Sequence, residues 1–413
     1  MSGLAAALVI VPLTAAGSAS AAAAPRQTAA ALAPAAVKTS TTGGLLAWGD
    51  GQSGQLGDGT TKSSDVPRKV KLPAGTTVTS VRGGCLFSLA LTSKGQVLAW
   101  GSNAEGQLGN GTTASTDRPV SVKIPKGVKV TVVRAGCAFG LALTSTGRVL
   151  AWGSNAFGQL GNGTVHAKHV PVYVKLPSGT KVTAITAGSS HSVAVTAAGH
   201  AFAWGYGEDG ELGNGSTDNS DVPVEVQMPA GTTVQGVAAG ASFTIARTST
   251  GLYGWGDNGS GQLGDGDTTS TDVPVAIPIL IRGQPIGNPV QVSAGCDHTL
   301  VLFSKGGVLA WGYNLYGQLG DGTTADSDKP VAVSLPAGTV VSGIAAGCFH
   351  SMAETTTGQV MAWGYNADGE LGDGNHAATD VPVDVQIAAG TGVTDIASGP
   401  TAAHSFAITG NAG

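Results

Sequence analysis

The sequence predicts an all-β fold, a seven-bladed β-propeller of four-stranded blades in which the N-terminal strand completes the last blade and closes the ring. The first observation is a repeat. All seven tryptophans are followed by glycine, and they stand 52, 52, 52, 51, 56 and 52 residues apart. The second is a strand pattern, because apolar residues alternate or run in short blocks bounded by Gly, Pro, Asn and Thr. A four-stranded unit repeated at about this length is typical of a propeller. The repeated pairs begin at Trp48, Trp100, Trp152, Trp204, Trp255, Trp311 and Trp363.

The elements of a repeat follow one order in every copy. In the second copy we expect strands at residues 120–124, 130–135, 141–144 and 149–152, the last two joined by a tight turn at Gly147. After each Trp-Gly comes a loop with the segment Gly-Gln/Glu-Leu-Gly-Asp/Asn-Gly, as at residues 54–59. No stretch of the chain predicts a sizeable helix.

The two ends of the repeat region complement each other. The first copy begins with the strand residues 45–48 and has no hairpin strand before it, whereas the last copy ends with residues 405–409 and has no strand after it. One blade that contains both ends would leave no open sheet edge. We therefore expect residues 43–49 to complete the last blade.

Two recurring runs resemble those of a known family. Trp-Gly-x-Asn-x-x-Gly-Gln-Leu-Gly-x-Gly-Thr, as at residues 100–112, and Ala-Gly-Cys-x-His-Ser-x-Ala, as at residues 346–353, are similar to the repeat of the regulator of chromosome condensation family. The resemblance covers roughly residues 43–410 and implies a seven-bladed propeller, here in a secreted bacterial member. The chain is more distantly similar to the propeller-type β-lactamase inhibitory proteins, but its Gly-Leu-Gly-Asp-Gly-Thr and Val-Pro segments depart from their pattern.

The N-terminus predicts export. Residues 4–16 are apolar but too short to span a membrane, and small residues follow in an Ala-x-Ala pattern, so residues 1–24 are interpreted as a signal peptide. Residues 25–42, rich in Ala, Thr and Pro, are interpreted as a disordered linker and residues 43–413 as the propeller. We expect a secreted monomer whose mature chain does not insert into a membrane.

The charge of the chain argues against nucleic-acid binding. The net charge is -5, with only 21 lysines and arginines in 413 residues. A protein that tracks phosphates needs a basic stripe. We therefore expect no nucleic-acid partner.

The cysteines share one repeat position. They are Cys85, Cys137, Cys296 and Cys348, and the other copies carry Ser189, Ala241 and Pro400 there. In adjacent blades they form two pairs, Cys85 with Cys137 and Cys296 with Cys348. On an innermost strand, equivalent atoms of neighbouring blades would lie about 6 to 7 Å apart, near the upper limit for bridging. Two disulfides and four buried free thiols both stay open, whereas zinc is not expected because the close Cys-x-x-Cys spacing is missing.

Repeated polar residues are interpreted as framework. His191, His298, His350 and His404 share a position with Phe87, Phe139 and Phe243. A position that accepts phenylalanine is one of packing, and we expect each histidine to donate a hydrogen bond to a neighbouring loop backbone. The single Asp or Asn of each Gly-Leu-Gly segment favours a turn over a calcium loop. We therefore predict no catalytic residue, no metal site and no cofactor.

Residues that differ between copies are the candidates for function, since a repeated scaffold places function in its loops. Aromatic and large apolar residues occupy the Trp-Gly loops of some copies only, and aromatic residues concentrate at interface hot spots. They form a candidate rim for an unidentified protein or a cell-surface glycan, although they could also cover the edges of neighbouring blades. The candidates are Phe157, Tyr206, Tyr313, Leu315, Tyr316 and Tyr365.

Three other functions are weighed against this one. Inhibition of a secreted enzyme is the sharpest form of the binding hypothesis. A propeller enzyme acting on glycans would need acids peculiar to one or two copies; Glu354 and Arg247 are such intruders at an otherwise apolar position. Guanine-nucleotide exchange, which the family resemblance implies, would need a protruding wedge, for which only residues 277–289 of the longer fifth repeat qualify.

Overall fold

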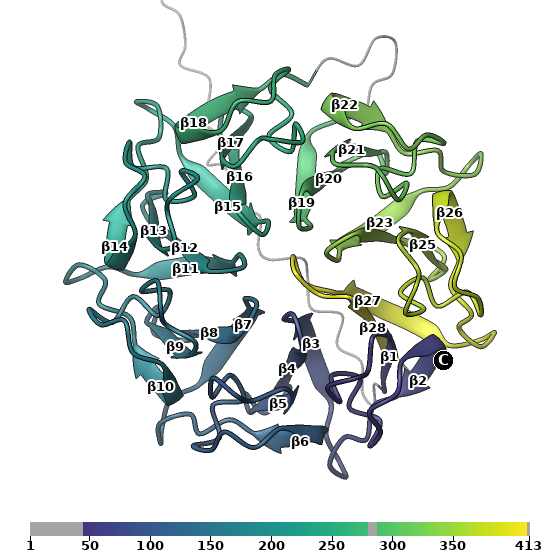
Figure 1. Ribbon diagram of the computed structural model, residues 1–413, viewed down its shortest axis with the longest axis horizontal. Coiled ribbons are helices and arrows are strands. Elements are labelled where there is room, and N and C mark those ends of the chain that lie inside the picture. Colours follow the sequence, from purple (N-terminus) through teal and green to yellow (C-terminus); the bar gives the residue numbers. More distant parts are fainter. Residues whose placement is uncertain (1–43, 280–286, 411–413) are drawn as a thin grey trace, which may run out of the picture. The chain divides into compact units, whose positions relative to one another are not determined.

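The computed structural model describes residues 44–279 and 287–410, and these form a ring of seven four-stranded antiparallel sheets (Figure 1). They belong to one compact unit, Thr39–Gly413. The predicted seven-bladed propeller is confirmed. The proposed signal peptide and linker lie outside the described residues.

Six blades consist of four strands that are consecutive in the chain and in the sheet. The blades nearest the N-terminus are β3 (Val78–Gly83), β4 (Phe87–Thr92), β5 (Val97–Gly101), β6 (Thr116–Ser121); β7 (Val130–Ala135), β8 (Phe139–Thr144), β9 (Val149–Gly153), β10 (Lys168–Tyr173); and β11 (Val182–Ala187), β12 (His191–Thr196), β13 (Ala201–Gly205), β14 (Ser220–Glu225). The next three are β15 (Val234–Ala239), β16 (Phe243–Thr248), β17 (Leu252–Gly256), β18 (Thr271–Ile277); β19 (Pro289–Ala294), β20 (His298–Phe303), β21 (Val308–Gly312), β22 (Ser327–Ala332); and β23 (Val341–Ala346), β24 (His350–Thr355), β25 (Val360–Gly364), β26 (Thr379–Asp384).

The seventh blade joins the two ends of the chain, as predicted. It contains β1 (Leu45–Gly49), β2 (Ser64–Lys69), β27 (Gly392–Ala397) and β28 (His404–Gly410) in the order β2-β1-β28-β27. β1 pairs with β28 from Leu45 opposite Ile408 to Gly49 opposite His404. The chain therefore contributes two N-terminal strands to the closure, where one had been expected. Figure 1 shows these strands beside each other at the meeting point of the purple and yellow segments.

The outer strand of each blade begins earlier than its apolar residues suggest. The strand expected at residues 120–124 is β6, Thr116–Ser121, and it belongs to the preceding blade rather than to β7. β6 pairs with β5 through a bulge between Ala99 and Gly101, so polar residues enter the ladder. Val122 follows the strand and is buried in the core between blades. The apolar pattern at residues 120–124 therefore reflects packing between blades rather than the hydrogen-bonded ladder of the strand.

The repeated tryptophan connects neighbouring blades. Trp100 is fully buried, and its indole N–H donates to the carbonyl of Gln55 at 2.7 Å. All seven tryptophans make the equivalent bond, at 2.7 to 2.9 Å. The Gly-Leu-Gly part of each loop folds between blades and packs against the indole ring. A Cβ on Gly57, whose φ is +68°, would lie 2.7 Å from the Trp100 indole nitrogen. The Trp-Gly and Gly-Leu-Gly motifs are therefore two sides of one contact.

A ring of backbone hydrogen bonds surrounds the centre of the propeller. Cys85 N–H donates to the Cys137 carbonyl at 3.0 Å, Cys137 N–H donates to Ser189 at 3.1 Å, and the pattern continues around to Cys348, which donates to Ala402 at 2.9 Å. Ala402, not Pro400, therefore occupies the cysteine position in the last blade. Two extra residues in the loop between Gly399 and His404 displace the alignment by sequence.

Two disulfides reinforce this ring. The structure joins Cys85 to Cys137 and Cys296 to Cys348, with Cα atoms 4.5 and 4.4 Å apart. The expected separation of 6 to 7 Å was wrong, because direct backbone hydrogen bonds draw these inner loops together.

Candidate functional site

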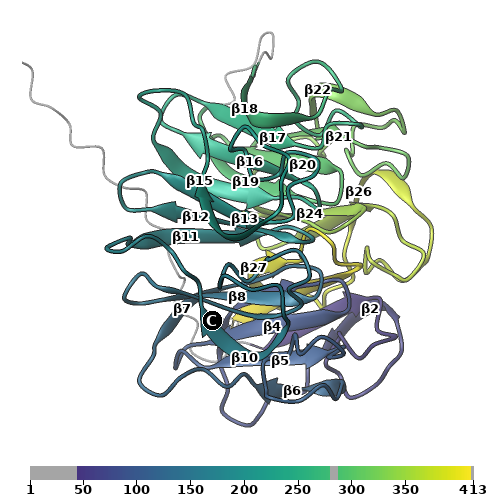
Figure 2. The same cartoon turned by 60° about the vertical axis from the view of Figure 1, so that its left-hand side comes forward.

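All six candidate residues lie in loops of one face. Consecutive strands are antiparallel, so the loops after the first and third strands of every blade emerge on the same side of the ring. We call this side the Trp-Gly face, because each loop after a third strand follows a Trp-Gly pair. Figure 2 shows the ring of blades in an oblique view, turned by 60° from that of Figure 1.

Four aromatic rings of this face form one cluster. Tyr316 lies 4.9 Å from Tyr365, 5.6 Å from Phe349 and 6.2 Å from Tyr313 between ring centroids. The rings belong to two adjacent blades, β19–β22 and β23–β26, and all are half-buried. Leu315, next to Tyr316 in the chain, is 58% exposed. The structure thus brings together four of the predicted residues and adds Phe349.

Phe349 was missed by the sequence reasoning, although a signal was present. It precedes the buried His350 in the loop between β23 and β24. At this position the other copies hold Leu86, Ala138, Ser190, Ser242, Asp297 and Ala403. An aromatic residue in one copy, at a position that varies between copies, meets the same criterion as the six candidate residues.

Phe157 and Tyr206 form a separate aromatic pair. Their ring centroids are 5.1 Å apart, and they bridge blades β7–β10 and β11–β14. Phe157 is 39% exposed. Blade β15–β18 stands between this pair and the four-ring cluster, so the six predicted residues do not form a single patch of rings.

Carboxylates of the loops between the two groups of rings interact electrostatically with one another and with both groups. Burial, followed by the charge of Asp257, raises the pKa of Asp297 to about 6. Burial and the same Asp257 raise the pKa of Asp209. The Asp209 carboxylate in turn acts on Tyr206, and Asp297 acts on Tyr313; burial is the largest cause of the raised pKa of both tyrosines. We call this set of residues the aromatic-acidic band; its members are Phe157, Tyr206, Asp209, Asp257, Asp297, Tyr313, Tyr316, Phe349 and Tyr365.

The loops of the Trp-Gly face are almost free of positive charge. They contain sixteen carboxylates, against Lys62 as their only lysine or arginine within the described chain. The carboxylates are Asp50, Asp58, Glu105, Glu208, Asp209, Glu211, Asp218, Asp257, Asp265, Asp267, Asp297, Asp321, Asp326, Asp368, Glu370 and Asp373. Burial raises the pKa of Glu211 and of Glu370 to about 8, so these two are protonated near pH 7, and the negative charge of this face comes from the other fourteen.

The repeated histidines serve the framework, through a partner that was not expected. His404 Nε2 lies 3.0 Å from the Ser88 hydroxyl of the next blade, which donates to the Gln55 carbonyl at 2.7 Å. The ring nitrogen is therefore the donor. His298 and His350 bond the next blade's Ser351 and Ser405 in the same way. The serine hydroxyl was not expected as a partner, whereas the expected interaction with a neighbouring loop backbone occurs at His298, which also has a backbone hydrogen bond with Cys348 of the next blade.

The loop acids make turns. Asp58 Oδ1 accepts the backbone N–H of Thr60 at 2.9 Å, and Asn110 accepts that of Thr112 at 3.0 Å. Within residues 44–279 and 287–410, no three His, Cys, Asp or Glu side chains gather as a metal ion would require.

The central channel offers little for glycan chemistry. A cavity of about 230 Å³ there is lined by Arg82 and Arg134 and by one carboxylate, Asp395, among the described residues. Hydrolysis of a glycosidic bond ordinarily uses a pair of carboxylates. Glu354 and Arg247 lie in blades β23–β26 and β15–β18, with a whole blade between them, and Arg247 bonds Gln235 at 2.6 Å. The structure therefore does not bring Glu354 and Arg247 together.

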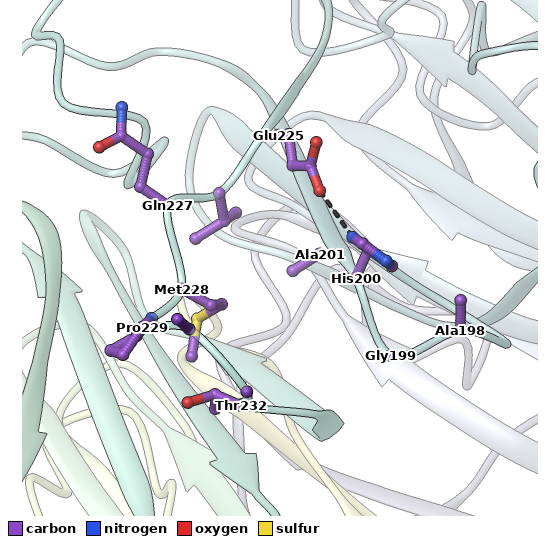
Figure 3. Close-up of a pocket in the computed structure, with 12 residues that line it drawn as sticks. Ala198, Gly199, His200, Ala201, Glu225, Gln227, Met228, Pro229 and Thr232 are labelled. Atoms are coloured by element: carbon purple, nitrogen blue, oxygen red, sulfur yellow. Dashed lines mark hydrogen bonds and ion pairs between the residues drawn. The ribbon is translucent and has the colours of Figure 1, made fainter.

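A hollow of about 640 Å³ lies on the opposite side of the ring, where His200 Nδ1 meets Glu225 at 2.6 Å (Figure 3). Both side chains are exposed. Blade β23–β26 has an equivalent hollow, in which Gln359 bonds Asp384 at 2.6 Å. Its recurrence identifies it as part of the blade framework.

The fifth-repeat excursion is described only in part. β18 extends to Ile277 and β19 begins at Pro289, while residues 280–286 lie outside the described chain. Among the residues that are described, none forms a helix with the length and hydropathy of a membrane span.

Comparison with known proteins agrees with the geometry. The model of the RCC1-like domain matches residues 44–407. The ultraviolet-B receptor UVR8 of Arabidopsis thaliana is 33% identical over 340 residues, covering 82% of this chain and 76% of the receptor. The E3 ubiquitin-protein ligase HERC2 of Homo sapiens is 33% identical over 371 residues, 88% of this chain but only 8% of the ligase.

Solved structures give the same fold. The crystal structure of human WBSCR16 superposes with a TM-score of 0.79 at 25% identity and covers 90% of this chain and 99% of that one. Yeast RCC1 (Prp20), bound to Kap60, gives 0.80 at 22% identity, covering 90% and 89%. These matches lend no support to the bacterial origin or to the similarity with β-lactamase inhibitory proteins.

Proposed function

The chain belongs to the RCC1-like domain family, and we propose that it is a non-catalytic scaffold that binds a protein through the aromatic-acidic band. The observation that carries this proposal is the band itself. The four-ring cluster is anchored on two adjacent blades, with the exposed Leu315 beside it. Phe157, of the separate aromatic pair, is exposed as well. Rigid aromatic anchors beside exposed apolar side chains are typical of interface hot spots.

The charge of the band selects the class of partner. Apart from the buried Glu211 and Glu370, fourteen loop carboxylates against one lysine attract a basic protein and repel an acidic one. Tyrosine rings add sites for lysine and arginine side chains. A cell-surface glycan is the second candidate, but its acidic forms would meet the same repulsion.

Absence of catalysis is part of the proposal. The channel cavity holds one carboxylate, and the repeated histidines are buried and bonded to serine hydroxyls. Burial lowers the pKa of His191 to about 4 and that of His404 to about 3, so these rings are neutral near pH 7 and exchange no proton with a ligand there.

Export is proposed as well. The apolar N-terminus followed by small residues predicts a signal peptide, and two disulfides are typical of an oxidising compartment. In that compartment the partner could be an enzyme that the propeller inhibits.

Variants at the exposed apolar residues test the proposal. The mature protein is immobilised and incubated with medium and surface extract of the producing organism, as wild type, Leu315→Asp, Phe157→Asp and Val340→Asp. Val340 is a matched control, because it is 46% exposed in a loop of the opposite face. We expect one or more basic proteins to be retained by the wild type and Val340→Asp and lost from Phe157→Asp, within the band, and from Leu315→Asp, beside it. Equal retention by all four would refute the role of the band.

A further inference from the structure

The face opposite the Trp-Gly face has a positively charged sector. Loops after the second and fourth strands of a blade emerge on this side. From the end of β2 to the start of β11, these loops contain seven lysines, one arginine and no carboxylate. All eight side chains are exposed; we call them the basic sector: Lys71, Lys94, Lys123, Lys126, Lys129, Arg148, Lys175 and Lys181.

Five of these residues lie on the side of two adjacent blades that is opposite the Trp-Gly face; we call this part of the sector its floor. The Lys129 side chain lies against Gly95, next to Lys94 in its hairpin, and a Cβ on Gly95 would come 3.5 Å from its Cγ. Lys181 lies in the same way against Gly147, beside Arg148. Arg148 is held over the ring of Tyr173 at 3.5 Å. Lys126 stands in the loop between β6 and β7, so the floor charges span both blades.

The other three lysines extend the sector up the outer wall. Lys71, Lys123 and Lys175 follow the outer strands of three successive blades, and their ammonium groups approach Gly59, Gly111 and Gly163. The sector therefore runs from the floor up the adjoining wall, where these three ammonium groups reach loops of the Trp-Gly face. The remaining loops of this face in the described chain contribute only Lys305.

We propose that the basic sector binds the surface of an anionic lipid bilayer. Seven of its eight charges are lysines, compact point charges without the planar fork with which arginine grips single phosphates or bases. Its loops hold no aromatic residue on which an unpaired base could stack. The charges are instead spread over the loops of adjacent blades, as contact with a sheet of lipid headgroups would require.

Charge segregation explains how a protein of net charge -5 can bind such a surface. The bilayer potential decays within a Debye length, about 8 Å at physiological salt, so it acts on the face turned toward it. The fourteen loop carboxylates of the Trp-Gly face other than the buried Glu211 and Glu370 oppose the reverse orientation. Bound in this way, the protein holds the aromatic-acidic band away from the membrane, but the lipid contact does not depend on the band having a partner.

Vesicle co-sedimentation tests the proposal with the mature protein. The probes are vesicles of phosphatidylglycerol and phosphatidylcholine, vesicles of phosphatidylcholine alone, and a single-stranded oligonucleotide. One variant carries Lys94→Gln, Lys126→Gln, Lys129→Gln and Lys181→Gln. Its matched control carries Lys62→Gln, Lys69→Gln, Lys168→Gln and Lys329→Gln, which lie outside the sector and remove the same charge. Melting curves verify that both variants are folded.

We expect the wild type to bind the anionic vesicles, to ignore the neutral ones and to be released by salt. At about a fivefold loss for each lysine near the surface, the sector variant should bind at least 50-fold more weakly. The control variant should stay within about threefold of the wild type. No sedimentation with anionic vesicles at low salt, equal losses in the two variants, or tighter binding of the oligonucleotide than of the vesicles would each overturn the proposal.

Discussion

Two buried glutamates make the stability of the propeller depend on pH. Glu211 and Glu370 are fully buried at the position where the other five copies carry glutamine. One oxygen of each accepts a backbone N–H, from Asp209 at 3.0 Å and from Asp368 at 2.9 Å. Burial raises the pKa of each carboxyl to about 8. We predict that Glu211→Gln with Glu370→Gln stabilises the protein increasingly as pH rises from 5 to 8.

The sign follows from proton linkage. The folded pKa lies above the ordinary value of 4.5, so the folded state binds the proton more tightly than the unfolded chain does. The stability that each protonated glutamate contributes to the folded state is complete below pH 4.5 and is lost as pH rises through 8. With these two pKa values, each site loses about 2 kcal/mol of unfolding free energy between pH 5 and pH 7. Glutamine keeps the N–H acceptor, as Gln159 does for Phe157 at 3.0 Å, and carries no charge to bury.

The assay is denaturant unfolding of both proteins in buffers from pH 5 to pH 8.5 at constant ionic strength. The buried histidines occur in both proteins, so their titration cancels in the difference. Glu208→Gln, an exposed carboxylate of the same loop, controls for the change in net charge. A difference between variant and wild type that does not change with pH would refute the burial argument.

Three further predictions follow from the framework. Deleting residues 44–49 removes the middle strand of the closing blade and Trp48, and should lower the unfolding free energy by more than about 5 kcal/mol; a melting curve like that of a chain lacking residues 1–38 would contradict ring closure. His404→Phe places at this position the residue found in three other copies. Burial lowers the pKa of His404 to about 3, so the stability that the neutral ring contributes to the wild type is lost as pH falls below 6.5. In chemical unfolding, the stability difference between variant and wild type should therefore shift by about 2 kcal/mol in favour of the variant from pH 7 to pH 4.5. Parallel pH profiles of the two proteins would refute this. The two disulfides should make the non-reduced chain four hydrogens lighter than the reduced chain by mass spectrometry. Cys85→Ser with Cys137→Ser should cost about 3 kcal/mol, and an unchanged denaturation midpoint would contradict this.

Much of the candidate site could be predicted because it deviates from a repeat. A repeat makes Tyr313, Tyr316 and Tyr365 visible as exceptions, since other copies hold Ser, Asp or Glu at the same loop positions. Their assembly with Phe349 could not be predicted, because Phe349 is 33 residues from Tyr316 and reaches it only across a blade boundary. The linking role of Asp257 and Asp297 was hidden for the same reason.

Periodicity determined the blade number, the strand type and the closure, because each blade must bury the same two faces and so repeats the same apolar residues. The tertiary structure alone decided where the outer strands begin, that Ala402 rather than Pro400 accepts the hydrogen bond from Cys348, and that the inner cysteines lie within bridging distance. It also decided the separation of charge, which composition conceals. A net charge of -5 is a sum over the chain, whereas the field at each face depends on which end of a blade each loop leaves. The alternation of antiparallel strands sends the acidic loops to one face and the lysine-rich loops to the other.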